Sequence, residues 1–524
     1  MRDCDVLVIG AGIAGTTAAL AAANTGARVI LASTVHIFSG SSFFGGTWGL
    51  GLIGPQDISD EAELTQTILS IGRGMAVPTL VTQLVKGIEP VIRQLESRGV
   101  HLRHAQATEQ QEFIPCFDHK QRSWQGLGRS AYRKAIADAL EIQQLMMLPY
   151  HELIDLVEDD CGICGALLYD STHSELRQIK AGAVVLATGG FGGLFEHTLT
   201  MPDVLGTAQA IALKHGAALI NAEFIQIMPG LLSPKKGIVF NEKSFRFARL
   251  EGFEEQNFSH LMTARAGHGP FSASLPDHLV DLAIARKSGG AKLSYSLPDV
   301  LPEFMQTYAD WFYHSFHCSP FKNVRIAPYA HAANGGIYID SSASCGIPGL
   351  FACGEATGGM HGADRIGGLS SANCLVFGEI AGQAAAAYAQ SHTTKMHSIV
   401  LPTKAASITD CQYALKHIRH IMDTNCLLGR ESRTLTQAQQ QLSHIQAQLS
   451  QRFTPSSDPQ SIALTARVSY ACLSARALVA AMLARPESRG SHFRHDFPTA
   501  NSACAQAHTL TLRREEFDIT PIVF

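Results

Sequence analysis

The sequence predicts an α/β fold, and three observations lead to it. Strand-like and helix-like patterns alternate from Asp3 to about Gly230, the arrangement that builds a parallel sheet. Residues 231–320 are richer in Lys, Arg, Phe and Ser and less periodic, which indicates an inserted second domain. From residue 401 onward the pattern is helical. With 46% hydrophobic and 16% charged residues, the 524-residue chain is expected to bury a large core.

The predicted elements can be placed along the chain in order. A strand at 5–9, a helix at 14–24 and a strand at 27–32 form a βαβ unit that opens the sheet. Further strand-like segments are predicted at 151–169, 183–187, 324–339 and 349–353. Further helices are predicted at 130–144, 372–390, 414–424, 436–449 and 462–484.

Charge and composition exclude several classes of protein. The 41 Lys and Arg residues against 45 Asp and Glu leave no basic excess for binding nucleic acid. The first apolar run has only the length of a strand, and no run of about 18 uncharged apolar residues follows, so we expect a cytoplasmic protein that is not integral to a membrane. Cys161 and Cys164 form the one C-x-x-C, interpreted as two free thiols at a hairpin, and no metal site is expected.

A glycine-rich turn follows the first predicted strand. Gly10, Gly12 and Gly15 form G-x-G-x-x-G, in which the first glycine permits a tight turn, the second lets the backbone approach a pyrophosphate and the third lets helix and strand pack closely. The turn, with Ile13 and Ala14, therefore predicts a dinucleotide site at a helix N-terminus. Ser33 stands where an acidic residue usually grips the ribose, which weakens an NAD assignment and remains compatible with FAD.

Further motifs resemble the succinate dehydrogenase/fumarate reductase flavoprotein family, which includes L-aspartate oxidase. They are A-T-G-G at 187–190, G-L-F-A-C-G-E at 349–355, H-G-A-D-R at 361–365 and E-S-R-G-S-H-F-R-H-D-F-P at 487–498. The resemblance implies a Rossmann-like FAD-binding domain at 1–230 and 326–400, an inserted α+β capping domain at 231–325, and a C-terminal helical domain at 401–524.

The resemblance also implies how FAD is held. Glu355 would bind a sugar or ribityl hydroxyl, and Ser370 and Ser371 would meet the pyrimidine edge of the flavin. Membrane-bound members carry FAD on a histidine in the loop after the second strand, and no histidine stands at 38–46, so noncovalent FAD is expected. The remaining FAD-binding candidates are Ser41, Ser42, Gly45, Gly46, Ala187, Thr188 and Gly189.

The family exchanges a hydride between flavin N5 and a carbon next to a carboxylate or carbonyl. Arg365 and His331 match its substrate-binding arginine and histidine, and Arg265 falls where the family places its proton-transferring arginine. An arginine can act as an acid or base only if it is buried and relayed, because its free pKa exceeds 12. Other candidates are His361, for contact with substrate or flavin, and Glu242 and Arg246, as relay partners.

Several residues depart from the family pattern. Met228 replaces a histidine that touches the substrate carboxylate, and a charge-assisted contact of that kind is worth about 1.5–3 kcal/mol. Gly230, Asp364 and Leu369 replace a threonine and two asparagines. We therefore expect a substrate other than plain fumarate or succinate, larger or less anionic at one end.

Three functions remain open at this stage. The leading one is an FAD-dependent oxidoreductase that reduces or introduces a C=C or C=N bond next to a carboxylate or carbonyl. The alternatives are an amino-acid oxidase like L-aspartate oxidase and a flavin electron-transfer subunit without its own substrate. The sequence shows no second dinucleotide-binding unit for NAD(P)H, no haem motif and no iron–sulfur cysteine set, so a separate electron donor or acceptor is expected.

Overall fold

A mixed sheet forms the centre of the molecule. The computed structural model describes residues 2–104, 114–253, 258–392 and 401–524. The strand order is β6-β2-β1-β9-β8-β7, with β17 also paired to β9. The parallel strands are β1 (Cys4–Ile9), β2 (Val29–Ser33), β6 (Met146–Pro149), β9 (Glu175–Leu186) and β17 (Leu350–Ala352). This arrangement confirms the Rossmann-like expectation.

β9 is a long strand that pairs with different strands along its two halves. Its first half pairs antiparallel with β8 (Gly162–Asp170), which pairs with β7 (His151–Asp159), and its second half lies between β1 and β17. Cys161 lies in the β7–β8 turn and Cys164 near the start of β8, so the two stand at a hairpin, as predicted, and both are free thiols. Cys161 is exposed and Cys164 is buried.

Two helices pack closely on the sheet because small residues line their contact. α1 (Ile13–Ala23) is buried along its whole length against α9 (Leu369–Ser391). A Cβ atom at Gly378 or Gly382 of α9 would lie 2.8 Å or 2.2 Å from a backbone oxygen of α1. A larger residue at either position would therefore push the helices apart.

A group of helices and short strands in the N-terminal half of the chain was not predicted from the sequence. It contains α2 (Asp60–Ile71), α3 (Pro78–Ser97) and a small antiparallel sheet of β3 (Leu50–Gly54), β5 (Ser123–Leu127) and β4 (Leu102–His104). α4 (Arg129–Ile142), which was predicted, follows β5. α3 buries one apolar stripe that includes Leu80, Leu84 and Ile88, the spacing of an amphipathic helix.

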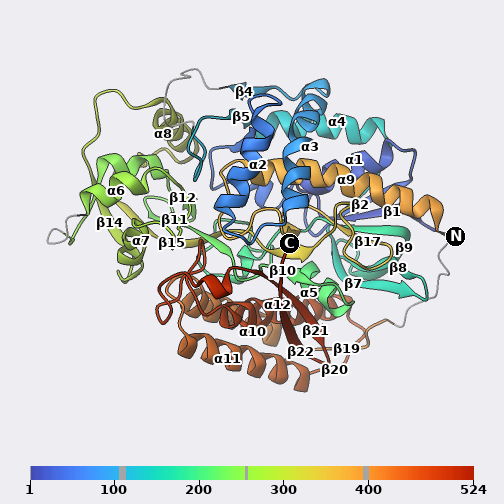
Figure 1. The fold of residues 1–524 in the computed structure, drawn as a ribbon. Helices are drawn as coiled ribbons and strands as arrows, with labels where there is room; N and C mark the ends of the chain where they lie inside the picture. The colour runs from blue at the N-terminus through green and yellow to red at the C-terminus, as the bar shows by residue number, and fades with distance from the viewer. Residues whose placement is uncertain (1, 105–113, 254–257, 393–400) are drawn as a thin grey trace.

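The inserted segment has a hydrophobic core of its own, which includes Phe240, Phe245, Tyr308 and Phe312. Its sheet has the order β12-β11-β15-β14-β13, and it lies to one side of the central sheet in Figure 1. The strands are β11 (Ile225–Ser233), β12 (Ile238–Val239), β13 (Ala248–Leu250), β14 (Ala291–Tyr295) and β15 (Val324–Ala333). The helices are α6 (Ser259–Arg265), α7 (His278–Ala285) and α8 (Glu303–Phe316). β11 and β15 cross the predicted boundaries at 230 and 325, so those boundaries stay predictions.

The C-terminal part contains the three predicted helices, α10 (Ile408–Cys426), α11 (Ser432–Gln451) and α12 (Pro459–Ala484). It ends in a hairpin that the sequence did not predict, β21 (Ala507–Arg513) and β22 (Glu516–Ile522). The hairpin extends a sheet containing β10 (Leu219–Ile220), β16 (Gly336–Tyr338) and β18 (Thr357–Gly358), and so returns to the first domain (Figure 1). Among the shorter elements, β19 (Lys404–Ala405) pairs with β20 (Thr454–Pro455), and α5 (Thr207–Lys214) packs on α12. The predicted boundary at residue 400 lies outside the described residues.

α12 is long and apolar enough to cross a membrane by length and composition alone. It packs against α5, α10 and α11, and 67% of its most apolar window is buried inside the protein. A core helix of a folded protein has this character, and the burial accounts for the apolar sequence.

Candidate functional site

Two adjoining cavities lie at the ends of the parallel strands. The first is a groove along Gly10–Ala14, Ser33 and Ala187–Gly189. The second, of about 260 Å³, lies between the first domain and the inserted segment, which we call the cap. Residues that line both are Ile13, Ser41, Ser42, Glu355 and Cys374. The groove and the cavity therefore form one continuous site, at the place where open α/β sheets bind ligands.

The glycine-rich turn has the geometry that its motif predicts. Gly10 has φ +106°, and a Cβ there would lie 2.3 Å from the backbone oxygen of Ala187. A Cβ at Gly15 would lie 1.8 Å from the backbone oxygen of Gly10, so helix and strand pack too closely for a side chain. Gly12 lines the groove and leaves the backbone open at the start of α1, where an anionic pyrophosphate is favoured.

Polar atoms without partners mark where a ligand would bind. Ser41 Oγ, Thr188 Oγ1 and Asn373 Oδ1 are buried and lack a hydrogen-bond partner among the described residues. Glu355 Oε1 accepts from the backbone N–H of Ala333 at 2.9 Å, and burial raises the pKa of this carboxyl. Buried polar groups require hydrogen bonds, so this set fits the hydroxyl and amide groups of a flavin nucleotide.

Three other predicted cofactor residues lie in different parts of the site. Ser370 and Ser371 line the second cavity at the N-terminus of α9, as expected from a helix end that favours electron-rich groups. Ser33 lines the groove, but its hydroxyl already bonds Ser39 Oγ at 3.2 Å.

Gly45 and Gly46 lie outside the lining of both cavities. The backbone oxygen of Gly46 accepts from the Val239 N–H at 2.8 Å, which fastens this loop to the cap. The neighbouring Phe44, Thr47 and Trp48 line the second cavity instead.

Arg365, His331 and His361 line the second cavity, so the structure brings these three predicted residues together. Arg365 Nη2 donates to Gln226 Oε1 at 2.6 Å, and no acidic side chain in the described part of the chain pairs with it. Burial and the Arg365 charge lower the pKa of His331 to about 3 and that of His361 well below its usual value. Both imidazoles are therefore neutral beside one cation, an arrangement that suits a carboxylate.

An apolar cluster lines the same cavity. Phe44, Trp48, Leu199, Met228 and Val239 pack together and all contribute to the cavity wall. Within the described ranges, Arg365 is the only Lys or Arg on that wall. One end of a bound substrate would thus meet a guanidinium, and another part would meet apolar side chains.

Arg265 does not reach the cavity. It is fully buried in the cap, where Nε and Nη2 donate to the two oxygens of Asp281 at 2.7 Å and 3.1 Å. Its other donors bind the carbonyl groups of His268 and Gly269. Asp281 raises the pKa of the guanidinium against the effect of burial. Arg265 is therefore placed as a structural cation, at variance with the proton-transferring position that the resemblance implied.

The two predicted relay partners also separate. Glu242 is buried and lines the second cavity. Arg246 lies outside the lining of both cavities, and its Nε donates to the backbone oxygen of Lys243. Arg246 therefore does not join Glu242 at the site.

Asp364 faces away from the cavity although it adjoins Arg365. Its carboxylate accepts from Ser272 Oγ at 2.7 Å and lies 3.4 Å from Arg73 Nε. The Asp364 carboxylate therefore interacts with the cap and with the turn after α2 rather than with the cavity. Asp364 therefore does not oppose an anionic substrate in the cavity, although it replaces a neutral asparagine of the family pattern.

The C-terminal signature supports the loop that carries Arg365. The backbone N–H and the hydroxyl of Ser491 both donate to the Ala363 oxygen at 3.1 Å. Glu487 accepts from Arg489 and Arg485, and Arg485 also donates to Glu223 of the first domain at 2.5 Å. The signature is thus a buried network of charges that fixes the geometry of the site.

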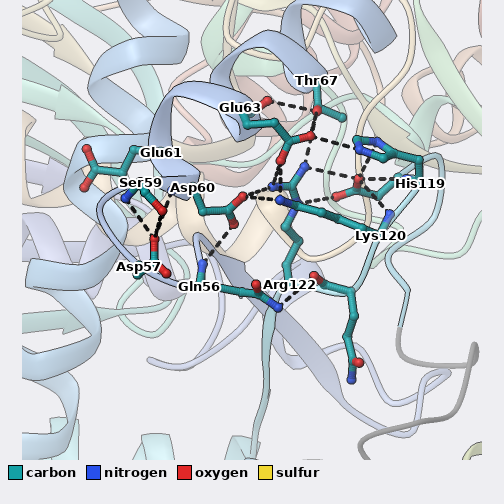
Figure 2. Close-up of polar contacts among 12 residues, drawn as sticks. Gln56, Asp57, Ser59, Asp60, Glu61, Glu63, Thr67, His119, Lys120 and Arg122 are labelled. Carbon is teal, nitrogen blue, oxygen red and sulfur yellow. Dashed lines mark hydrogen bonds and ion pairs between the residues drawn. The ribbon is translucent and has the colours of Figure 1, made fainter.

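Sequence analysis missed the segment that carries Cys116. Cys116 lines the second cavity, and no motif marks it. Arg122, six residues later, contacts Asp118 at 2.9 Å and is anchored to α2 through Asp60 and Glu63. Figure 2 shows the contacts of Arg122 and Lys120 with Asp60 and Glu63. The spacing of Asp118 and Arg122, with the acidic first turn of α2, is the one sequence signal for this anchor.

Comparison with known proteins identifies the family. Residues 5–371 match the FAD binding domain family, and residues 415–523 match the fumarate reductase flavoprotein C-terminal family. The chain belongs to the succinate dehydrogenase/fumarate reductase flavoproteins. It is an FAD-dependent oxidoreductase of this family, as predicted.

Relatives of this family align along nearly the whole chain. L-aspartate oxidase of Streptomyces coelicolor is 25% identical and covers 97% of this chain and 91% of its own. One component of the CoM/CoB fumarate reductase of Methanothermobacter marburgensis is 26% identical over 95% of each chain. The fold is similar to that of Mycobacterium smegmatis Sdh1 in complex with UQ1, with a TM-score of 0.81 at 22% identity over 99% of this chain and 94% of the other.

Proposed function

We propose that this flavoprotein reduces or forms the C=C bond next to the carboxylate of a monocarboxylic acid whose other end is apolar. The supporting observation is the make-up of the second cavity. It holds one guanidinium, Arg365, with two neutral histidines, and an apolar wall that includes Trp48 and Met228. A second carboxylate would have to be desolvated against that wall without a cation, which is unfavourable.

The polar side chains that line the cavity have distinct roles in the proposed reaction. Arg365 holds the substrate carboxylate with its planar fork, and His331 and His361 offer unpartnered ring nitrogens. FAD, when bound, supplies the hydride exchange. Glu355, Ser370 and Ser371 would hold it along the cavity. Electrons would come from, or pass to, a separate donor or acceptor.

The test is an anaerobic reoxidation experiment. The bound flavin is reduced with dithionite and its visible absorbance is followed as fumarate, crotonate or cinnamate is added. We expect crotonate or cinnamate to reoxidise the flavin at least 10-fold more efficiently than fumarate does. Preference for fumarate would overturn the substrate class, and reoxidation by O₂ or a quinone alone would overturn the reductase.

L-aspartate oxidase activity is the second candidate, because several relatives that align over nearly the full chain carry that name. The apolar wall and Met228 disfavour a substrate with two carboxylates. Release of ammonia and H₂O₂ from L-aspartate would establish this activity in place of the first.

A further inference from the structure

The proposed reaction needs a group that moves a proton, and Arg265 is not available for it. Its guanidinium is held by Asp281 behind the cavity wall. Of the acid–base side chains on the described wall of the second cavity, Glu355 and Cys374 also line the nucleotide groove. The others include the neutral histidines and Arg365, which surround the expected carboxylate. Cys116 and Glu242 remain.

Cys116 and Glu242 are neighbours on the cavity wall. Sγ of Cys116 lies 4.0 Å from Glu242 Oε1, and both residues line the cavity that contains Arg365. The backbone oxygen of Cys116 accepts from the Gly367 N–H at 3.2 Å, which fixes the thiol beside the loop of Arg365. The pair therefore lies within the substrate region rather than under the nucleotide.

A third group is directed at the sulfur. The Gly269 N–H donates to Cys116 Sγ at 3.2 Å, and Arg265 Nη1 donates to the His268 oxygen, the carbonyl of the same peptide. An N–H donor of this kind stabilises a thiolate that forms during the reaction. Arg265 would then act as a positioning residue, because it fixes the peptide that faces the thiol.

We propose that Cys116 and Glu242 form the proton-delivery pair of this enzyme. The Cys116 S–H bond breaks and its proton adds to the carbon next to the carboxylate, while the carbon remote from the carboxylate gains the hydride that bound, reduced FAD would supply. The Glu242 carboxylate then takes a proton from solvent and passes it to the thiolate. Oxidation of the saturated acid follows the same steps in reverse. This inference rests on the proposed function.

The electrostatics of the pair agree with these roles. Burial and the nearby Glu242 carboxyl raise the pKa of Cys116, so the thiol is protonated and able to donate near neutral pH. Lys243 and Arg265 act in the opposite direction and limit the cost of the thiolate. Glu242 and Cys116 also line an outer chamber with Lys243, Arg103 and Trp124, which provides a route for protons from solvent.

The first test is a single-turnover measurement on the FAD-loaded protein. The enoate that reoxidises the wild-type flavin fastest is mixed with reduced Cys116→Ala, Cys116→Ser and Glu242→Gln. We expect Cys116→Ala to slow reoxidation about 100-fold or more, the usual contribution of a positioned acid, while reoxidation by O₂ stays unchanged. Cys116→Ser should be intermediate, and Glu242→Gln should alter the pH profile. Cys318→Ala, a half-buried cysteine of the cap, is the matched control.

The second test reads the thiol without turnover. Alkylation of Cys116 by iodoacetamide is followed by mass spectrometry against pH, and we expect Glu242→Gln to shift its onset to lower pH. If the wild type reacts with an enoate and Cys116→Ala reacts equally fast, the proposed proton-delivery role of Cys116 and Glu242 is wrong. The proposed function would still stand in that case. Failure of every enoate with the wild type would overturn both.

Discussion

Ser272 of the cap donates a 2.7 Å hydrogen bond to Asp364, the residue next to Arg365. This contact joins the cap to the loop that holds the substrate-binding arginine. Arg73 approaches the same carboxylate from the turn after α2 at 3.4 Å. Burial nevertheless raises the pKa of Asp364 to about 6, so the charge state of this junction changes just below neutral pH.

Asp364→Asn should change how stability depends on pH. Because the pKa of Asp364 is raised in the folded state, the folded protein binds this proton more tightly, and the stabilisation is present at acid pH and is lost as pH rises through about 6. The variant should therefore gain about 1–1.5 kcal/mol relative to wild type between pH 5 and pH 7.5. Thermal unfolding at both pH values measures this, with the exposed Asp299→Asn as control. A relative loss at pH 7.5 would show instead that the ion pair with Arg73 dominates.

The flavin should dissociate when the protein is denatured. The loop at 38–46 has no histidine, and Ser41 and Ser42 line the cavity where the cofactor would lie. Precipitation with acid should leave FAD in the supernatant, where its absorbance can be measured. Flavin fluorescence that stays with the protein band on a denaturing gel would show a covalent link.

Arg365→Lys should lose substrate affinity while it keeps FAD. Lysine retains the positive charge and lacks the planar fork, so about one charge-assisted hydrogen bond, or 1.5–3 kcal/mol, should be lost. That loss corresponds to about a 10–150-fold weaker response of the oxidised flavin spectrum to an added carboxylate. Arg365→Gln should lose more. If the wild type, Arg365→Lys and Arg365→Gln bind the added carboxylate with equal affinity, the carboxylate does not bind at Arg365.

Arg265→Met should unfold the cap more easily because it leaves Asp281 buried without its partner. Removal of one member of a buried ion pair costs about 3–5 kcal/mol, and Asp281→Leu combined with Arg265→Met should recover part of it. Chemical denaturation of the wild type and these two variants measures this. A variant as stable as wild type but slow in proton transfer would return Arg265 to the role that the resemblance implied.

Local patterns predicted much of the fold because they reflect local physics. The β1-α1-β2 unit follows from its glycine spacing and apolar runs, and α10 to α12 follow from helical periodicity. The hairpin β21–β22 was not predicted, because its strands are largely half-buried or exposed and β21 pairs with β10, almost 300 residues earlier. A polar tail and an edge hairpin look alike until the partner strand is known.

In the site, too, local motifs predicted some residues, and long-range contacts that the motifs do not show place the others. Arg365, His331 and His361 lie within motifs that fix their backbone, and they meet at the cavity. Arg265 has no such motif, and its position depends on Asp281, which the local sequence does not single out. Cys116 has no motif either, and its segment is held by long-range contacts, among them that of Arg122 with Asp60 of α2, about 60 positions earlier.

Met228→His should restore binding of a second carboxylate. Met228 lies on β11 in the cavity wall, where a histidine could donate a hydrogen bond to an anion that the thioether cannot bind. We expect fumarate to reoxidise the reduced variant more efficiently by about 10-fold or more, equivalent to a contact of about 1.5–3 kcal/mol, and cinnamate to react less well. Met228→Leu, which keeps the wall apolar, should leave the wild-type preference in place. If Met228→His and Met228→Leu respond alike to both acids, the apolar wall does not select the substrate.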